Sequence, residues 1–463
     1  MVTRGSDSSA PALPAAASLR RIRQALASRE ITAPELIKRQ LEAAESSRRA
    51  VKAFSAINCG HALKAATESE QRYRNGTARL LEGLPIAIKD LIDTKDLDTC
   101  YGSAAYLGHR PAADADIVRA LLDQGAIIIG KTATHEFAWG VTTASVSFGD
   151  TRNPLDPSRI PGGSSGGAAA AIAHGAVAAG VGTDTGGSVR IPAALCGVVG
   201  FKPTIRLLPT GGVFPLSATC DHVGLLGRQV DDVVCLSRAL NVEIPESDAW
   251  LAARLGVVRE IAPVPLADDV AAVFDHALQR LTQTFSCVNL NAPHLFDGVF
   301  NAFSAIVLIE GGIEHFRRND WSRIATHYSP ETIDRLRRAQ AMDMRAYATA
   351  QQTRRRFIAN LHEAMSAVDY LVLPTCPCTA PPLNASNIDI GGWTGTVREA
   401  LMTYTAPFNI AGFPAISIPL PSGSQRLPAS LQLVARPGND GALLRIAQQI
   451  EAIVRGDSMA RHQ

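Results

Sequence analysis

The most informative part of this 463-residue sequence is a pair of glycine-rich loops, Gly162-Gly163-Ser164-Ser165-Gly166-Gly167 and Gly182-Thr183-Asp184-Thr185-Gly186-Gly187-Ser188. Fifteen of the 37 glycines lie between residues 162 and 227, where an even distribution would place roughly 5, so this window needs backbone without side chains. The two loops are therefore the first candidates for chemistry.

A strand, a helix and a second strand are predicted before the loops. The apolar run at residues 84–88 predicts a buried strand that ends on Lys89, residues 116–124 predict a helix, and residues 126–129 predict another buried strand. This order favours parallel pairing with helices on both faces. Because no linker or repeat divides the chain, we expect one large three-layer α/β/α domain around a mixed, mostly parallel sheet.

Further elements are predicted along the rest of the chain. Thr32 is followed by Glu35 three positions later, with Pro34 in the first turn, so a capping box opens a helix over residues 33–45. Residues 1–17 are rich in Ser, Ala and Pro and predict a disordered tail ahead of a domain over residues 18–463. The other predictions are helices over 19–27, 168–174 and 331–366, and strands over 177–181, 370–373, 415–418 and 430–434.

Composition argues against several classes of partner. The 45 Lys and Arg residues nearly balance 43 Asp and Glu residues, and both signs are spread along the chain, so we expect no nucleic-acid partner. The longest small-apolar stretch, residues 168–181, is interrupted by His174 and Gly175 and is too short to span a bilayer. Eight cysteines without a CxxC pair predict reduced thiols and no metal site. We expect a cytoplasmic protein with no membrane partner.

The loops admit a hydrolase interpretation centred on Ser164. Residues 162–166 match the G-x-S-x-G pattern of a nucleophile elbow, which would make the protein an esterase. That motif needs a strand leading into the turn, whereas Pro157 and Pro161 interrupt the preceding residues, and no histidine stands in a distinctive context. This interpretation is a remote alternative.

A second interpretation joins both loops to Lys89. A serine hydroxyl becomes a strong nucleophile when a base takes its proton, and a lysine can be that base if burial lowers its pKa. Lys89 follows an apolar strand, where a buried lysine would be expected, and Gly186-Gly187-Ser188 can turn backbone N–H groups toward one point, as an oxyanion hole requires. Ser164 can pass a proton between Lys89 and Ser188.

The two loops, continued by Val189-Arg190-Ile191-Pro192-Ala193, resemble the signature of the amidase signature family. The resemblance extends to residues 83–90 (Gly-Leu-Pro-Ile-Ala-Ile-Lys-Asp), 196–204 (Cys-Gly-Val-Val-Gly-Phe-Lys-Pro-Thr) and 411–419 (Ala-Gly-Phe-Pro-Ala-Ile-Ser-Ile-Pro). It covers residues 19 to 455, with the signature core at about residues 80–230.

The resemblance implies the fold of that family and a Ser–Ser–Lys triad. In it, Ser188 is the nucleophile that forms the acyl-enzyme, Ser164 is the bridging serine on a cis peptide, and Lys89 is the base. The oxyanion hole would consist of backbone N–H groups of Thr185, Gly186, Gly187 and Ser188. Asp184 and Arg190 would brace the loop as an ion pair. No metal or organic cofactor is implied.

Two branches of the family fit this pattern. One is a stand-alone amidase that hydrolyses a small carboxamide, or a urea-like amide, to acid and ammonia. The alternative is the glutaminase A-subunit of a tRNA-dependent amidotransferase complex. Residues 143–146 read Thr-Ala-Ser-Val where that subunit has Thr-Glu-Asn-Ser, and its glutamine-binding acid falls at Asn439, beside Asp440. Both departures favour the stand-alone enzyme.

The substrate is expected to be a small molecule, and a homodimer is left open by the sequence. Ten arginines between residues 314 and 356 are expected mainly on the solvated faces of long helices; the alternative is that one of them, on an inner face, pairs with a substrate carboxylate. Trp139 is a candidate for the wall of the acyl pocket. With 5% aromatic residues, the composition favours a small amide over a lipid amide.

Overall fold

The computed structural model describes residues 17–246, 248–290, 292, 294–421 and 427–456. Of the predicted disordered tail, only Ala17 belongs to the described residues, and it is buried. The prediction for residues 1–16 lies outside the described part of the chain.

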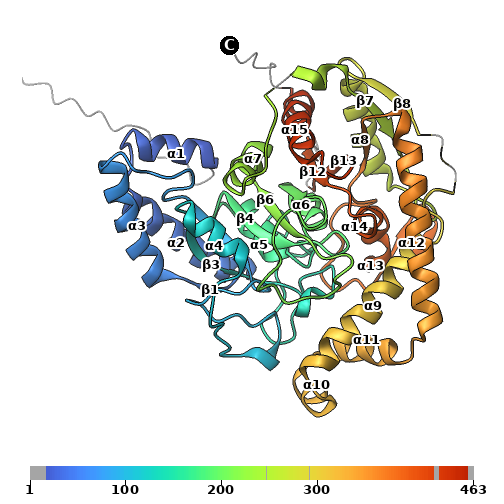
Figure 1. Ribbon diagram of the computed structural model, residues 1–463, viewed down its shortest axis with the longest axis horizontal. Coiled ribbons are helices and arrows are strands. Elements are labelled where there is room, and N and C mark those ends of the chain that lie inside the picture. Colours follow the sequence, from blue (N-terminus) through green and yellow to red (C-terminus); the bar gives the residue numbers. More distant parts are fainter. Residues whose placement is uncertain (1–16, 247, 291, 293, 422–426, 457–463) are drawn as a thin grey trace, which may run out of the picture.

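Eleven strands of the described chain form one continuous sheet through the centre of the molecule (Figure 1). In spatial order they are β1 (Phe54–Ile57), β3 (Ile127–Thr132), β2 (Pro85–Lys89), β4 (Ala179–Thr183), β6 (Val223–Gly227), β5 (Val199–Lys202), β12 (Ala415–Leu420), β13 (Ala429–Val434), β9 (Tyr370–Pro374), β7 (Arg254–Val257) and β8 (Ser286–Asn289).

The α/β class and the mixed sheet are confirmed, but the expectation of mostly parallel pairing is wrong. Within the described strands, four neighbouring pairs are parallel, β2 with β3 and β4, and β7 with β8 and β9. The other six pairs are antiparallel. Only eight residues separate β12 from β13, which is too few for a parallel crossover and sufficient for a hairpin. The strand–helix–strand pattern at residues 84–129 is a local feature that does not extend to the whole sheet.

Helices cover both faces of the sheet. α5 (Gly166–His174) and α6 (Arg190–Cys196) pack on one face, and α7 (Val230–Ala239), α8 (Asp268–Leu281) and α15 (Asp440–Arg455) pack on the other. Alternate residues of β12 follow this division: Ile416 and Ile418 join the core that contains Leu443 of α15, whereas Ala415 joins the core that contains Ile191 of α6. Burial on both faces makes the central strands almost wholly apolar.

The remaining elements flank this sheet. They are α1 (Leu19–Ala27), α2 (Ala33–Val51), α3 (Cys59–Arg74), α4 (Asp116–Asp123), the short hairpin of β10 (Asn387–Ile390) and β11 (Trp393–Thr396), and the 3-10 turns η1 (Ala104–Tyr106), η2 (Glu136–Ala138), η3 (Asp248–Ala252) and η4 (Met365–Ala367). The capping box is confirmed, since Thr32 Oγ1 accepts the Glu35 N–H and the Glu35 carboxylate accepts the Thr32 N–H. α2 continues six residues beyond its predicted end at residue 45.

A second group of helices lies at the right of Figure 1. It comprises α9 (Val299–Arg318), α10 (Trp321–His327), α11 (Pro330–Gln340), α12 (Met344–Ala364), α13 (Val397–Thr403) and α14 (Ala406–Ile410). The single helix predicted over 331–366 is two helices, because the Asp343 side chain accepts the Ala346 N–H at 2.8 Å and starts a new one.

One helix of the described chain, α9, is long and apolar enough to cross a membrane by length and composition. It packs against α11, α12 and α14, and Phe303 and Ile306 are fully buried. A core helix with this packing passes the same length and composition test, so the feature carries no membrane assignment.

All eight cysteines are free thiols in the structure. Cys196, Cys220, Cys376 and Cys378 are buried, and burial raises the pKa of the Cys378 thiol to about 12. Among the described residues, no group of three or more His, Cys, Asp or Glu side chains could hold a metal ion.

Candidate active site

Lys89 is the last residue of β2 and is completely buried. Its Nζ donates hydrogen bonds to Ser164 Oγ and Thr183 Oγ1, each at 2.7 Å. Thr183 ends β4, which pairs in parallel with β2, so the ends of two neighbouring strands hold the ammonium group. Burial lowers the pKa of Lys89 to about 7, although the charges of Asp184 and Asp221 act in the opposite direction. A lysine in this state can exchange protons near neutral pH.

Ser164 follows the cis peptide bond between Gly163 and Ser164, in the first glycine-rich loop. Thr143 fixes this loop, because its hydroxyl donates to the Gly162 carbonyl at 2.8 Å and accepts the Gly166 N–H at 3.1 Å. A side chain at Gly163 would contact the Thr143 hydroxyl at 2.7 Å. The glycine therefore permits the close approach that places the Ser164 hydroxyl against Lys89.

Ser165 has a different environment from Ser164. Its hydroxyl donates to the Thr183 carbonyl at 3.1 Å and accepts the Thr183 N–H at 3.3 Å. Its own N–H donates to the Ser188 carbonyl at 3.0 Å, which joins the two glycine-rich loops. The Ser165 side chain is thus committed to β4, whereas the Ser164 hydroxyl meets the buried lysine.

The second loop contains backbone N–H groups without acceptors. Within the described residues, the N–H groups of Thr185, Gly186 and Ser188 have no hydrogen-bond acceptor, although this loop is buried. Buried and unpaired amides are rare in proteins, so three in one loop indicate a site for an oxygen atom of a ligand. Gly187 differs from the expectation, because its N–H already donates to Asp184 Oδ1 at 2.8 Å. The free donors are therefore three of the four predicted amides.

Asp184 and Arg190 form the predicted ion pair at 2.9 Å, and both side chains are fully buried. Arg190 also donates to Gln432 Oε1 and Asn409 Oδ1, each at 2.6 Å, and to the Thr405 carbonyl at 3.0 Å. Burial alone would raise the pKa of Asp184, but the charge of Arg190 holds it well below its usual range. The pair fixes the second loop to β13 and α14, and the sequence did not predict that Asn409 and Gln432 take part.

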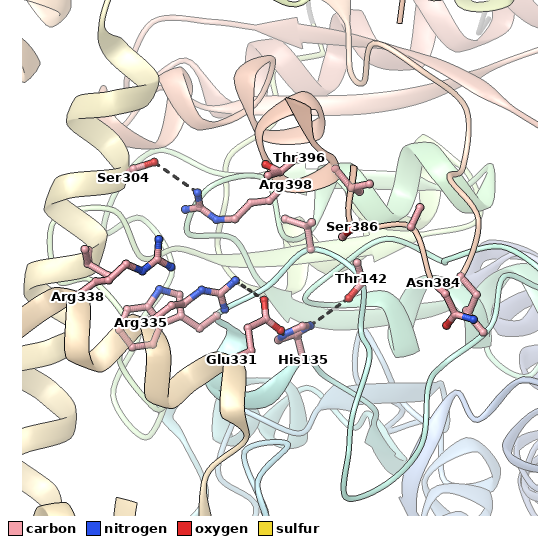
Figure 2. A pocket seen from close by; sticks show the side chains of 16 residues that line it. His135, Thr142, Ser304, Glu331, Arg335, Arg338, Asn384, Ser386, Thr396 and Arg398 are labelled. Carbon is pink, nitrogen blue, oxygen red and sulfur yellow. Dashed lines mark hydrogen bonds and ion pairs between the residues drawn. The ribbon is translucent and has the colours of Figure 1, made fainter. Parts of the chain in front are cut away.

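A cavity of about 530 Å³ is lined by residues of α9, α11 and α13 and by the segments around residues 135–142 and 383–386 (Figure 2). Lys89, Ser164 and Ser188 are not among its lining residues. Two of its lining residues are neighbours in sequence of residues that contact the loops. Thr142 precedes Thr143, which bonds to the first loop, and Ser304 follows Phe303, which packs on the second. Phe303 and Met402 pack so closely on Gly186 that a side chain there would overlap both. The cavity and the loop that carries the free amides thus have α9 and α13 as common neighbours.

The cavity is rich in positive charge. Figure 2 shows the guanidinium groups of Arg335, Arg338 and Arg398 gathered at one side, with Glu331 between Arg335 and His135. Glu331 pairs with Arg335 at 2.5 Å and lies 3.2 Å from His135 Nε2. Burial would raise the pKa of Glu331, but the hydrogen bond from His135 and the charges of His135 and Arg335 lower it to about 2. The prediction of a cavity-facing arginine in residues 314–356 agrees with the positions of Arg335 and Arg338.

Other residues singled out in the sequence have mixed outcomes. Trp139 lines the cavity and also stacks on His315, with ring centroids 5.5 Å apart. Asp440 does not line the cavity, since it accepts the Thr204 N–H at 2.7 Å, and Asn439 precedes α15.

Among the described residues, no histidine bonds to Ser164, whose hydroxyl contacts Lys89 instead. Arg398 had no signal in the sequence, because an arginine near the start of a short helix is ordinarily exposed.

The chain is similar to known proteins over nearly its whole length. A family model described as Amidase matches residues 35–444. The A-subunit of the Glutamyl-tRNA(Gln) amidotransferase of Cyanothece sp. (strain PCC 7425 / ATCC 29141) is 32% identical, over 94% of this chain and 97% of that protein. A solved amidase structure is 32% identical with a TM-score of 0.87, over 95% of this chain and 100% of the other. The structure of the corresponding A-subunit from Thermotoga maritima is 28% identical with a TM-score of 0.77, over 95% of each chain.

The buried pair generates a stability prediction. Arg190→Met leaves the Asp184 carboxylate buried without its cation, so we expect the free energy of unfolding to fall by about 3–5 kcal/mol. Chemical denaturation of the two proteins measures the difference.

Arg110→Met provides the control, because Arg110 pairs with Asp98 at 2.9 Å on the surface. Its loss should cost about 1 kcal/mol or less. Equal effects of the two substitutions would contradict the role of the Asp184–Arg190 pair as a buried brace.

Proposed function

The chain belongs to the amidase family, and on that premise we propose that it hydrolyses a small carboxamide through an acyl-enzyme on Ser188, with Ser164 as the bridge to the base Lys89. The observation that carries the proposal is the 2.7 Å contact between Lys89 Nζ and Ser164 Oγ at a buried lysine whose pKa is about 7. A lysine of that kind can accept a proton at neutral pH, as nucleophile activation requires.

In the proposed first step, Ser188 Oγ bonds to the amide carbonyl carbon while its proton passes to Ser164, whose own proton passes to Lys89. The N–H groups of Thr185, Gly186 and Ser188 donate to the carbonyl oxygen as it becomes negative. Lys89 then returns its proton through Ser164 to the amide nitrogen, the C–N bond breaks, and ammonia leaves. Water attacks the acyl-enzyme by the same proton path, and the carboxylic acid is released.

Gly187 has a supporting part in this scheme. Its backbone φ of 124° lies in a region that favours glycine, and a side chain there would overlap Thr405. Because its N–H is already bound to Asp184, the proposed oxyanion hole uses the three remaining amides. Asp184 thereby orients the loop without touching the substrate.

The proposed chemistry could operate in a subunit of an amidotransferase complex or in a stand-alone amidase, and different observations favour each. The relatives named as amidotransferase A-subunits favour the alternative setting, a glutaminase that delivers ammonia to partner subunits, over the stand-alone amidase that the sequence favoured. Ala144 in place of a glutamate and the engagement of Asp440 with Thr204 favour the stand-alone enzyme, as does the likeness to a solved amidase. Eight free thiols support a cytoplasmic location in either setting. A homodimer stays a prediction.

The nucleophile is tested by covalent labelling with a fluorophosphonate. The wild-type protein should be labelled on Ser188, and Ser188→Ala should abolish the adduct because the attacking oxygen is gone. Peptide mapping by mass spectrometry identifies the modified residue.

Ser165→Ala is the matched control, since the Ser165 hydroxyl contacts the backbone of Thr183 and not Lys89. This variant should retain labelling. If Ser188→Ala is still labelled and the adduct maps to Ser164, the esterase interpretation with Ser164 as nucleophile is correct instead.

The setting is tested by ammonia release. We expect the purified chain, without ATP, tRNA or other subunits, to release ammonia from members of a panel of aliphatic, aromatic and urea-like amides. Turnover restricted to glutamine in the presence of amidotransferase partner subunits would establish the alternative setting. An enzyme-coupled ammonia assay provides the measurement.

The pKa of Lys89 predicts the pH dependence of the rate. The base must be neutral, so protonation below pH 7 should lower kcat/KM about tenfold per pH unit, while the rate should level off on the alkaline side. A profile that rises only near pH 10, the ordinary range for lysine, would contradict the assignment, as would a Lys89→Ala variant with unchanged kcat/KM.

A further inference from the structure

Arg398 is the one arginine lining the cavity that lacks a carboxylate partner among the described residues. Arg335 is paired with Glu331 at 2.5 Å, and Arg338 is paired with Asp334 at 3.1 Å. Arg398 instead contacts Ser304 Oγ at 3.5 Å, and its guanidinium carbon lies 5.6 Å from the Phe300 ring centroid. Arg398 is part-buried, and although the charges of Glu331 and Glu399 act on it, neither carboxylate forms an ion pair with it. A bound anion would offset the free-energy cost of partly removing the guanidinium from water.

The cavity has no free acid to receive a cationic group. Among the described residues on its walls, Glu331 is the only carboxylate, and it is engaged by both Arg335 and His135. Burial and the charges of Arg335 and Arg338 lower the pKa of Arg398 to about 10, while the charges of Glu331 and Glu399 act in the opposite direction, and the guanidinium stays charged at neutral pH. The cavity therefore favours an anion over a zwitterion or a cation.

Two helices, α13 and α9, connect Arg398 to the loop of the proposed reaction centre. It is on α13, four residues before Met402, so one helical turn of about 5.4 Å separates it from the side chain that packs on Gly186. Its partner Ser304 follows Phe303 on α9, and Phe303 packs on the same glycine. A ligand held by Arg398 would therefore have to span roughly one helical turn, about 5 Å, to approach Gly186.

We propose that Arg398 binds the carboxylate of the amide substrate, and that the substrate is a short anionic carboxamide with its carboxylate at the other end and no ammonium group. This inference rests on the proposed function and narrows its substrate class. The guanidinium donates paired hydrogen bonds to the carboxylate, a geometry that a neutral amide cannot provide. Because Glu331 is occupied, an amino acid amide such as glutamine would leave its ammonium group without a partner.

Three substrates of equal chain length test the proposal: glutaramate, which is glutamine without its amino group, L-glutamine, and neutral pentanamide. Wild-type kcat/KM should be highest for glutaramate. Arg398→Gln should lower kcat/KM for glutaramate by about 10- to 100-fold, mainly through KM, and change the value for pentanamide less than about threefold. Arg337→Gln, an exposed arginine of α11 outside the cavity, is the matched control and should preserve the preference.

A second readout does not depend on turnover. Glutarate should slow the fluorophosphonate labelling of Ser188 in the wild-type protein and in Arg337→Gln, and this protection should be lost in Arg398→Gln.

Each outcome bears on the inference separately from the proposed function. A wild-type preference for glutamine or pentanamide, or equal losses for all three substrates in Arg398→Gln, overturns the inference while the amidase chemistry stands. Labelling of Ser188 without glutarate protection also overturns the inference alone. A wild-type protein that shows neither labelling of Ser188 nor ammonia release overturns the proposed function as well.

Discussion

The buried contact between Asp184 and Arg190 is the interaction on which the geometry of the second glycine-rich loop depends. Asp184 accepts the Gly187 N–H, and Arg190 reaches Asn409 and Gln432, which are more than two hundred residues away in sequence. With neither charge exposed, each group is tolerable only because the other is present. The brace therefore determines which amides stay free, and so where a carbonyl oxygen could bind.

The environment of Lys89 depends on a balance of burial and charge. Burial lowers the pKa of Lys89 to about 7, yet the charges of Asp184 and Asp221 oppose that shift. Because Arg190 lies against Asp184, much of this carboxylate's negative charge is already compensated, and its influence on the lysine is limited. The ion pair thus shapes the loop, while burial allows the neighbouring lysine to become neutral.

The sequence predicted local features well and long-range ones poorly. The capping box at Thr32, the strand that ends on Lys89 and the Asp184–Arg190 pair follow from short motifs, whose residues lie within a few positions of one another. The direction of strand pairing depends on partners that are distant in the chain, and it was predicted wrongly. Arg398 was missed for the same reason: only the folded chain shows that it faces the cavity occupied by arginines from α11.

The order of these parts along the chain has a consequence for how such an enzyme can diversify. Residues 89–190 supply the side chains proposed to react and the second glycine-rich loop, and residues 405–432 supply the groups that hold Arg190. Between them, α11 contributes Glu331, Arg335 and Arg338 to the cavity wall, whereas α9 also packs on α14 and, through Phe303, on Gly186. Changes in α11 can therefore alter the size and charge of the cavity while the second glycine-rich loop keeps its geometry.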